Sequence, residues 1–318
     1  MSHKFNSTRQ ITRLLAPIIV LTGLIAFIAL PAHSNNALTG KGNGRIAFVS
    51  NRDNVERIYT MAPDGSGLTK LTNGPHQLQP AWSPDGTKIA YMDRLKDATA
   101  LYLMNADGSD SKLLASNIFH NVNLAWSPDG TKIAFCSLTP HQGTSSKFSL
   151  HVINADGTNE VSLAEGSGSP TWSPDGKQIA FTTFRGIDLI NPDGTNRRQL
   201  ARLNTWVLHS LAWSPDGKEI VFGSNRSSSD PHGNTKSWFT IETISADGGD
   251  GNNARLIGYG RNPSWSPDGS KIVFEHNDTE TSLIQIWVMH RDGKNKIQLT
   301  DTGTNWSPSW QPLLDYSN

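Results

Sequence analysis

The chain has 318 residues, and its 28 Lys and Arg side chains balance its 28 Asp and Glu side chains, so the formal net charge is zero. Clustered basic residues are what a nucleic-acid surface needs, and their absence argues against a nucleic-acid partner. Glycine (28), proline (17) and tryptophan (10) are abundant, and no long helical period follows residue 30. This composition favours an all-β globular body.

The N-terminal segment has the pattern of an export signal. Lys4, Arg9 and Arg13 precede an apolar stretch over residues 14–30, and Ala32-His33-Ser34 places small residues at the two cleavage positions. We therefore expect residues 1–34 to be a signal peptide that is removed after Ser34. Because the apolar stretch approaches the length that spans a membrane, an uncleaved anchor is the alternative, and it would be the only membrane contact. The expected location is the periplasm, with secretion or membrane anchoring as alternatives.

A tryptophan closes a short segment six times in the chain. The first five run directly into Ser-Pro-Asp-Gly and then a segment such as Lys88 to Met92. The six are Trp82, Trp126, Trp172, Trp213, Trp265 and Trp310. Their spacings of 41 to 52 residues lie near the period of a four-stranded propeller blade.

Each period contains four short candidate strands. In the first full period they are Gln79 to Trp82, Lys88 to Met92, Leu101 to Asn105 and Lys112 to Ala115. Ser-Pro-Asp-Gly suits a tight turn, because Pro presets φ and Gly tolerates positive φ. A second Asp-Gly turn, such as Asn105-Ala106-Asp107-Gly108, recurs between the third and fourth strands, where Asp-Gly favours a hairpin. One period is therefore one blade.

The two ends of the repeat region complement each other. Arg45 to Val49 matches a second strand with no tryptophan strand before it, and Pro308 to Trp310 matches a first strand with none after it. We predict an all-β, six-bladed propeller of four-stranded blades over residues 45–311, closed by the C-terminal strand joining the N-terminal blade. Residues 35–44 would be a linker and 312–318 a tail, and we expect a monomer. The single cysteine, Cys136, falls in a second strand and is expected to be a packed thiol.

At this point the residues resemble a known family. The repeat Trp-Ser-Pro-Asp-Gly-x-Lys-Ile-Ala-Phe, followed by a strand such as Ile58 to Met61, an Asp-Gly turn and Leu71-Thr72, is similar to the propeller repeat of TolB, the periplasmic component of the Tol-Pal envelope system. Ser50-Asn51-Arg52-Asp53 strengthens the likeness. TolB has an α/β domain before its propeller, whereas here only residues 35–44 separate the leader from the first strand. The repeat also resembles propellers that precede the catalytic domain of prolyl-oligopeptidase-type peptidases.

The TolB resemblance implies a non-enzymatic propeller that binds a protein or peptide, in cell-envelope organisation, with an envelope lipoprotein as an expected partner class. The alternative is a propeller enzyme, a hydrolase or lyase acting on a sugar, lactone or peptide in the central channel. Convergence of two of His76, His120, His209 and Arg261 with an acid in one small pocket would favour the enzyme.

The loops predict where binding occurs. Both sets of Asp-Gly turns must lie at one end of the strands, and they are short and uniform. The opposite end, which we call the loop face, carries second-to-third-strand loops of very different length: Gly223 to Ser237 is long, Leu138 to Lys147 is intermediate and Thr183 to Gly186 is nearly absent. Variable loops on a rigid scaffold are the usual place for recognition.

Polar residues three positions before each tryptophan are predicted to ring the channel mouth: Gln79, Asn123, Ser169, Ser210, Asn262 and Ser307. Small residues one position before it, Ala81, Ala125, Thr171, Ala212, Ser264 and Ser309, would share the same side, because alternate residues of a strand do. Side chains from the connecting loops would enter the same mouth: His76, His120, Trp206, His209, Tyr259, Arg261 and Trp306. We predict that this ring is the binding surface; the alternative is that it only hydrates the channel.

Other chemistries are less well supported. His76 and His120 are equivalent positions of adjacent blades, but the other repeats offer no third His or carboxylate there, so no metal is predicted. The repeated Asp85, Asp129 and their equivalents have a turn role. The sequence has no Gly-x-Ser-x-Gly elbow, no His-Glu-x-x-His and no phosphate-binding glycine loop. We predict no cofactor and no catalytic residue, although a catalytic group assembled from different blades needs only spatial proximity.

Overall fold

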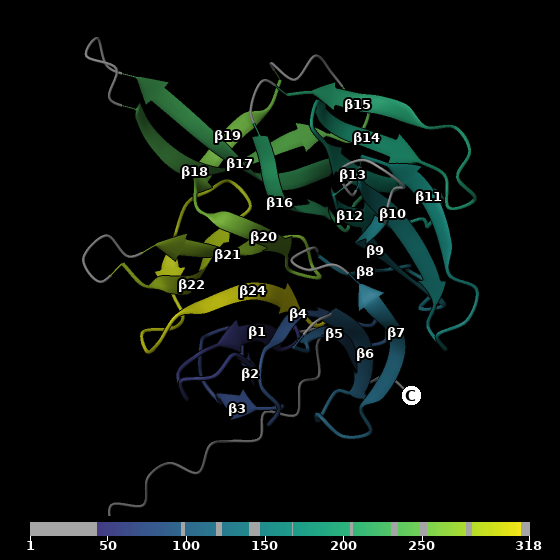
Figure 1. The fold of residues 1–318 in the computed structure, drawn as a ribbon. Helices are drawn as coiled ribbons and strands as arrows, with labels where there is room; N and C mark the ends of the chain where they lie inside the picture. Colours follow the sequence, from purple (N-terminus) through teal and green to yellow (C-terminus); the bar gives the residue numbers. More distant parts are fainter. Residues whose placement is uncertain are drawn as a thin grey trace, which may run out of the picture. The chain divides into compact units, whose positions relative to one another are not determined.

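The computed structural model describes residues 43–96, 99–118, 123–139, 147–166, 168–203, 206–229, 235–248, 253–277 and 282–312. The regular structure of these residues consists of strands, which form six four-stranded antiparallel sheets arranged as blades around a central axis (Figure 1). No helix in the described ranges is long and apolar enough to cross a membrane. The predicted signal peptide, most of the linker and nearly all of the tail lie outside these ranges.

The six blades follow one another in chain order, and each blade runs from its innermost to its outermost strand. Blade one is β24 (Asn305–Trp310), β1 (Ile46–Ser50), β2 (Arg57–Met61) and β3 (Thr69–Lys70); blade two is β4 (Gln77–Trp82), β5 (Lys88–Arg94), β6 (Thr99–Asn105) and β7 (Lys112–Ile118); blade three is β8 (Ala125–Trp126), β9 (Lys132–Thr139), β10 (Lys147–Asn154) and β11 (Val161–Glu165). Blade four is β12 (Gly168–Trp172), β13 (Ile179–Thr183), β14 (Gly186–Ile190) and β15 (Arg198–Arg202); blade five is β16 (Trp206–Trp213), β17 (Glu219–Ser229), β18 (Thr235–Ser245) and β19 (Arg255–Tyr259); blade six is β20 (Arg261–Trp265), β21 (Lys271–Asn277), β22 (Ile284–His290) and β23 (Ile297–Gln298).

The predicted ring closure is confirmed. β1 pairs antiparallel with β24, with Ile46 opposite Trp310. Beyond the strands, the Gln311 backbone N–H donates to the Arg45 carbonyl at 2.8 Å. The Arg45 backbone N–H donates in return to the side-chain Oε1 of Gln311 at 3.0 Å. Segments at the two ends of the propeller are thus held in one sheet, which leaves no open edge between blade one and blade six.

The Ser-Pro-Asp-Gly turns are held by the same hydrogen bonds in blade after blade. In blade three the Ser127 hydroxyl donates to Asp129 Oδ1 at 2.6 Å and accepts from the Lys132 N–H at 2.9 Å. Asp129 Oδ1 also accepts from the Thr131 N–H at 3.0 Å. Gly130 has a φ of 71°, a left-handed conformation that glycine adopts at little cost. The turn end of the molecule is therefore fixed by its own side chains.

Three of the six repeated tryptophans join their blade to the preceding one by a hydrogen bond. Trp126 Nε1 donates to the Ala81 carbonyl of the preceding blade at 3.1 Å, and Trp172 Nε1 donates likewise to the Ala125 carbonyl at 3.2 Å. Trp265 repeats the bond to Ala212. The acceptor in each case is an alanine, whose small side chain lets the indole reach the carbonyl. Trp213 Nε1 instead donates to Gly217 of its own turn, and the buried Trp82 Nε1 has no partner among the described residues.

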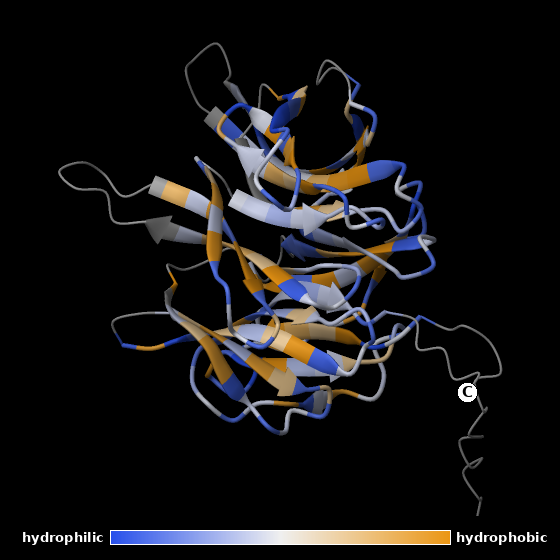
Figure 2. Cartoon of the chain, turned by 90° about the vertical axis from the view of Figure 1, so that its right-hand side faces the viewer, coloured by the Kyte–Doolittle hydropathy of each residue, from blue (hydrophilic) through white to orange (hydrophobic). Residues whose placement is uncertain are grey.

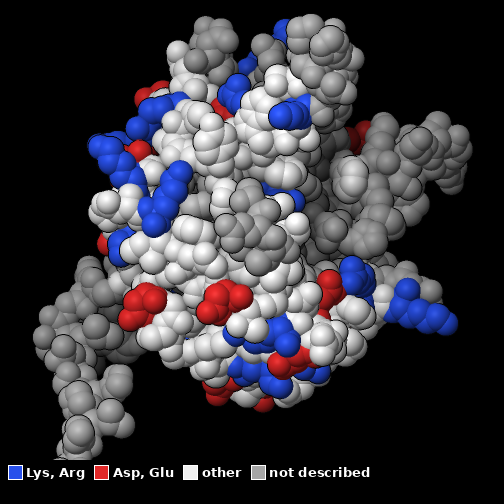
Figure 3. Space-filling model, turned by 90° about the vertical axis from the view of Figure 1, so that its left-hand side faces the viewer, with Lys and Arg blue, Asp and Glu red and all other residues white. Residues whose placement is uncertain are grey.

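The core lies between the sheets. The phenylalanine of each Ile-Ala-Phe-type strand is fully buried, at Phe48, Phe135, Phe181, Phe222 and Phe274, and the hydrophobic segments of Figure 2 follow the strands rather than the turns. Cys136 is also fully buried, as expected, and burial raises the pKa of its thiol. Basic and acidic side chains are interspersed on the side of the molecule shown in Figure 3.

One predicted loop differs from the structure. We expected a long polar loop from Gly223 to Ser237, but β17 continues to Ser229 and β18 begins at Thr235, with continuous pairing from Glu219 opposite Ser245 to Ser229 opposite Thr235. Neither glycine nor proline interrupts residues 224–229, and the buried Glu242 accepts hydrogen bonds from Ser224 and Arg226 across the hairpin. Most of the predicted loop is therefore a continuation of the β17–β18 hairpin.

Candidate functional site at the channel mouth

The two ends of the propeller differ in which apolar side chains they expose. Five of the exposed large apolar residues lie at strand ends or loops of the loop face: Leu95, Phe148, Phe184, Trp238 and Tyr259. The other five, Leu68, Leu113, Val161, Leu256 and Ile297, lie on or beside the outermost strand of a blade. The exposed large aromatic side chains of the described residues are thus on the loop face, and aromatics are enriched in recognition surfaces.

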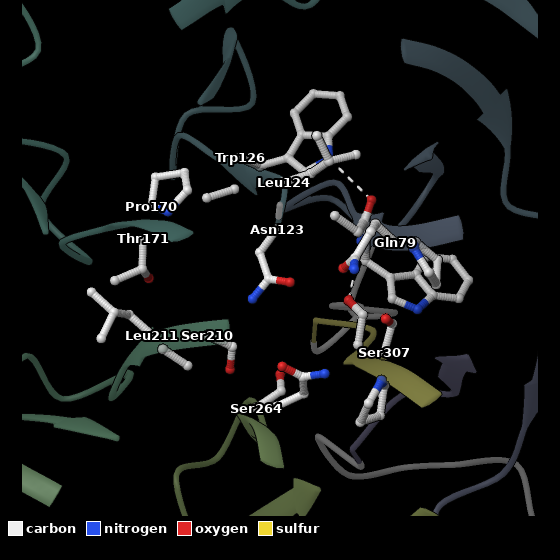
Figure 4. Close-up of a pocket in the computed structure, with 18 of the residues that line it drawn as sticks. Gln79, Asn123, Leu124, Trp126, Pro170, Thr171, Ser210, Leu211, Ser264 and Ser307 are labelled. Carbon is white, nitrogen blue, oxygen red and sulfur yellow. Dashed lines mark hydrogen bonds between the residues drawn. The ribbon is translucent and has the colours of Figure 1, made fainter. Parts of the chain in front are cut away.

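The central channel is a cavity of about 320 Å³ that is lined by residues of all six innermost strands and their flanks. Gln79, Asn123, Ser210, Asn262 and Ser307 line it, as predicted, together with the small residues Ala81, Ala125, Thr171, Ala212, Ser264 and Ser309. In Figure 4 the Asn123 amide points into the open centre, whereas the buried Ser210 hydroxyl donates to the Pro263 carbonyl at 3.3 Å. Ser169 occupies the matching place in β12 but is not among the lining residues.

A repeated bulge, rather than simple alternation, presents these polar side chains. The strand register shifts next to Gln79, Ser169, Asn262 and Ser307, and their φ angles of 53°, 22°, 48° and 52° are positive. Such a conformation costs a non-glycine residue on the order of 1–3 kcal/mol. The intervening residues Pro80, Pro170, Pro263 and Pro308 line the channel as well. Our argument from alternate residues was therefore incomplete, because bulges bring successive residues to one side and are frequent near functional sites.

A second cavity, the side pocket, opens beside the channel between blades six and one and has a volume of about 360 Å³. It brings together five of the predicted residues, Gln79, Arg261, Asn262, Trp306 and Ser307, with Glu275, Ile284 and Thr304. Three of these, Gln79, Asn262 and Ser307, line the channel too. The side pocket is therefore continuous in its lining with the channel mouth.

Glu275 is the residue of this pocket that our sequence argument missed. It is 2% exposed, and its Oε1 accepts from Asn262 Nδ2 at 2.5 Å and from the Ser307 backbone N–H at 2.6 Å. Burial raises the pKa of this carboxyl above its ordinary value, and the two hydrogen bonds and the Arg261 charge offset the effect only in part. A strongly perturbed carboxyl in a cavity is a candidate functional group.

The repeat itself carried a signal that could have revealed Glu275. The position after the aromatic of each second strand holds Val49, Met92, Cys136, Thr182 and Gly223 in blades one to five, and Glu275 in blade six. The four of these neighbours that carry larger side chains are buried. A carboxylate at a position that the other blades fill with apolar or small residues is a departure that the architecture does not require.

Arg261 is held at the rim of the side pocket. Its Nη2 donates to Asn277 Oδ1 at 2.8 Å, its guanidinium carbon lies 4.3 Å from the centre of the Phe239 ring, and its Nε lies 4.0 Å from Glu275 Oε2. A guanidinium over an aromatic face gains a cation–π interaction. The arginine is thus fixed by β18 and β21 before any ligand arrives.

The remaining predicted residues lie elsewhere or outside the description. His76 is paired with Glu56, its Nδ1 2.8 Å from Oε2, and lines neither cavity. Tyr259 is exposed at the end of β19. Trp206 and His209 belong to β16, but their side chains are outside the described part, as is all of His120. Of the four residues proposed to mark an enzyme, only Arg261 is found beside an acid in a small pocket, within the ranges that can be described.

Metal ligation has no site among the described side chains, where no group of three or more His, Cys, Asp or Glu comes together to hold an ion.

Comparisons with known proteins bear on the repeat. No protein-family model matches the chain. The TolB homologue of Chlorobaculum tepidum is 35% identical over 135 residues, 41% of this chain and 30% of the relative. That of Chlorobium luteolum is 30% identical over 166 residues, 50% of this chain and 32% of the relative. The resemblance to TolB is confirmed. The chain nevertheless spans only about a third of the length of these curated relatives.

Solved structures agree on the fold. TolB from Acinetobacter baumannii superposes with a TM-score of 0.68 at 22% identity, over 87% of this chain and 69% of that one. An oligogalacturonate lyase in complex with manganese gives 0.54 at 17% identity, over 80% and 73% of the two chains. The nidogen/laminin complex gives 0.62 at 13% identity, over 85% and 98%. At these identities the likeness shows the propeller alone, which proteins of unrelated function share.

Proposed function

We propose that this protein is an exported, non-enzymatic TolB-like propeller that binds a protein or peptide segment at its loop face, within the cell envelope. The similarity to TolB homologues supports the class of protein. The observation that carries the proposal is that exposed aromatic side chains and the side pocket occur at the loop face, where the channel also presents the polar residues Gln79, Asn262 and Ser307. Exposed aromatics on the same face as a pocket with polar groups are typical of a site that holds another chain.

The proposal is tested by affinity capture from envelope extract with the full chain carrying a C-terminal tag, compared with an Arg261→Ala/Trp306→Ala double variant. We expect a partner that the unmodified protein retains and the folded double variant loses, and an envelope lipoprotein is the partner class that the TolB analogy favours. Titration of the purified partner should then show affinity at least about tenfold weaker for the variant, which corresponds to about 1.4 kcal/mol.

A matched control separates the loop face from general surface effects. Leu113→Ala/Leu256→Ala removes two exposed apolar side chains from the outermost strands β7 and β19 and should leave capture unchanged. Equal capture by all three proteins, or loss in the control alone, would contradict the proposed surface. If no partner is captured and the chain instead converts an oligosaccharide, lactone or peptide, the propeller enzyme replaces this proposal.

A further inference from the structure

We propose that the side pocket is a receptor for a primary ammonium group, that of one lysine side chain of the segment bound at the loop face, with Glu275 as its acceptor. The inference rests on the proposed function for the nature of the partner, but the chemistry of the pocket can be tested without it.

Glu275 is not needed to build a blade. Valine, methionine, cysteine, threonine and glycine take its place in the other five blades, and all six sheets form. Burying a carboxylate costs free energy unless it is well compensated. Apolar residues at this position would avoid that cost, so the acid points to a task other than packing.

The two oxygens of the Glu275 carboxylate differ in their hydrogen bonds. Oε1 accepts two short bonds from Asn262 and Ser307, whereas no described residue donates a hydrogen bond to Oε2, and Arg261 Nε lies 4.0 Å from it. That distance exceeds the length of an N–H···O bond, and the guanidinium already bonds Asn277 and covers Phe239. Oε2 can therefore accept a further donor.

Two further hydrogen-bond acceptors lie beside Glu275. Asn262 Oδ1 and Ser307 Oγ are buried next to Glu275 and have no hydrogen-bond partner. Unpaired buried polar atoms are uncommon in folded proteins. An ammonium group has three donors and no acceptor, so a small rearrangement of Asn262 and Ser307 would let it meet Oε2, Oδ1 and Oγ together.

The apolar wall fits a lysine stem. Trp306 and Ile284 line the same pocket, and the methylene chain of a lysine packs on such surfaces while its charged head reaches a polar group. A tryptophan face also attracts the cation directly. A volume of about 360 Å³ lies at the small end of ligand pockets, which suits one side chain rather than a whole domain. A carboxylate ligand would instead meet the negative charge of Glu275.

The probe is Nα-acetyl-lysine N-methylamide, titrated into the ¹⁵N-labelled full chain and followed by the indole N–H signal of Trp306, which is assigned from its absence in Trp306→Phe. Nα-acetyl-norleucine N-methylamide has a similar aliphatic chain but no charge. We expect saturable shifts with the lysine compound and at least tenfold weaker binding of the norleucine compound. Glu275→Met, which copies blade two, should weaken lysine binding at least tenfold, whereas Glu160→Gln, a remote exposed acid, should not.

Four results would overturn the inference. Equal binding of norleucine would make the pocket merely apolar, and stronger binding of the arginine analogue would make it a guanidinium site. Lysine binding that survives both Glu275→Met and Glu275→Gln would lie elsewhere. If no compound binds while partner capture still depends on Arg261 and Trp306, the proposed function stands and the lysine receptor fails. If lysine binds but no partner is captured, the lysine receptor stands and the proposed function fails.

Discussion

The two ends of this propeller differ in how far their residues and hydrogen bonds repeat from blade to blade. At the turn end, the same serine–aspartate hydrogen bonds recur in blade after blade, and the aspartates bond the backbone of their own turn. At the loop face the blades diverge: hairpins vary in length, aromatics are exposed, and blade six carries a buried acid, Glu275, where the other blades have apolar or small residues. Repetition marks what the fold needs, and departure from repetition marks where a specific activity can reside.

The comparison predicts that aromatic residues at the two ends differ most in their effect on stability. Trp172, 7% exposed between blades three and four and bonded to Ala125, should cost about 3–5 kcal/mol when replaced by alanine, as deletion of a large buried aromatic does. Phe184, 73% exposed at the loop face, should cost less than about 0.5 kcal/mol. Urea unfolding of Trp172→Ala and Phe184→Ala measures both, and similar losses would refute the distinction.

Hydroxyl groups at the two ends should differ in the same direction by a smaller amount. Ser127→Ala removes a buried hydroxyl that accepts the Lys132 N–H and donates to Asp129, so we expect a loss of about 1–3 kcal/mol. Thr302, whose exposed hydroxyl bonds only the neighbouring Asp301, is the control, and Thr302→Ala should change stability by less than about 0.5 kcal/mol. A larger loss for Thr302→Ala would mean that the loop face is as tightly built as the turn end.

The turn end could be predicted from sequence because its interactions are local. The turn residues Ser127, Asp129 and Gly130 lie within four residues of one another. The same residue types recur at each repeat, so both the turn and the repeat period could be predicted from the sequence. The bulge at Gln79 was not predicted, because a positive φ is expected at glycine and Gln79 is not one; the proline that follows the bulged residue at Pro80, Pro170, Pro263 and Pro308 was the local signal that could have marked it.

The side pocket was predictable only in part, for a related reason. Arg261 and Trp306 were found by their place beside the innermost strands. Glu275 lies on a second strand, and it meets Ser307 only because the ring closes and brings blade six against blade one. Alignment of the repeats would have exposed the acid as unusual, but its partners come from the closed ring and not from neighbouring sequence.

The smallest expected difference between the two ends is in how the free energy of unfolding depends on pH. The pKa of Asp129 is lowered, chiefly by the Ser127 hydroxyl and then by the Thr131 N–H, so its contribution to stability is present above its unfolded pKa and lost as pH falls. Glu275 has the opposite sign: burial raises its pKa, so folding is favoured with the carboxyl protonated and stability is lost as pH rises through the folded pKa.

Glu275→Gln removes this ionisation while keeping an oxygen that can accept from Asn262 and Ser307. The unfolding free energy of the variant minus that of the unmodified protein should therefore grow between pH 4 and pH 7, by about 1.4 kcal/mol for each unit of raised pKa; the turn aspartates are common to both proteins and cancel. Urea unfolding at each pH measures it. A difference that is flat or reversed would show that Arg261, whose Nε lies 4.0 Å from Glu275 Oε2, already compensates the buried charge. A gain in stability together with the loss of lysine binding would mean that blade six keeps a destabilising acid for recognition.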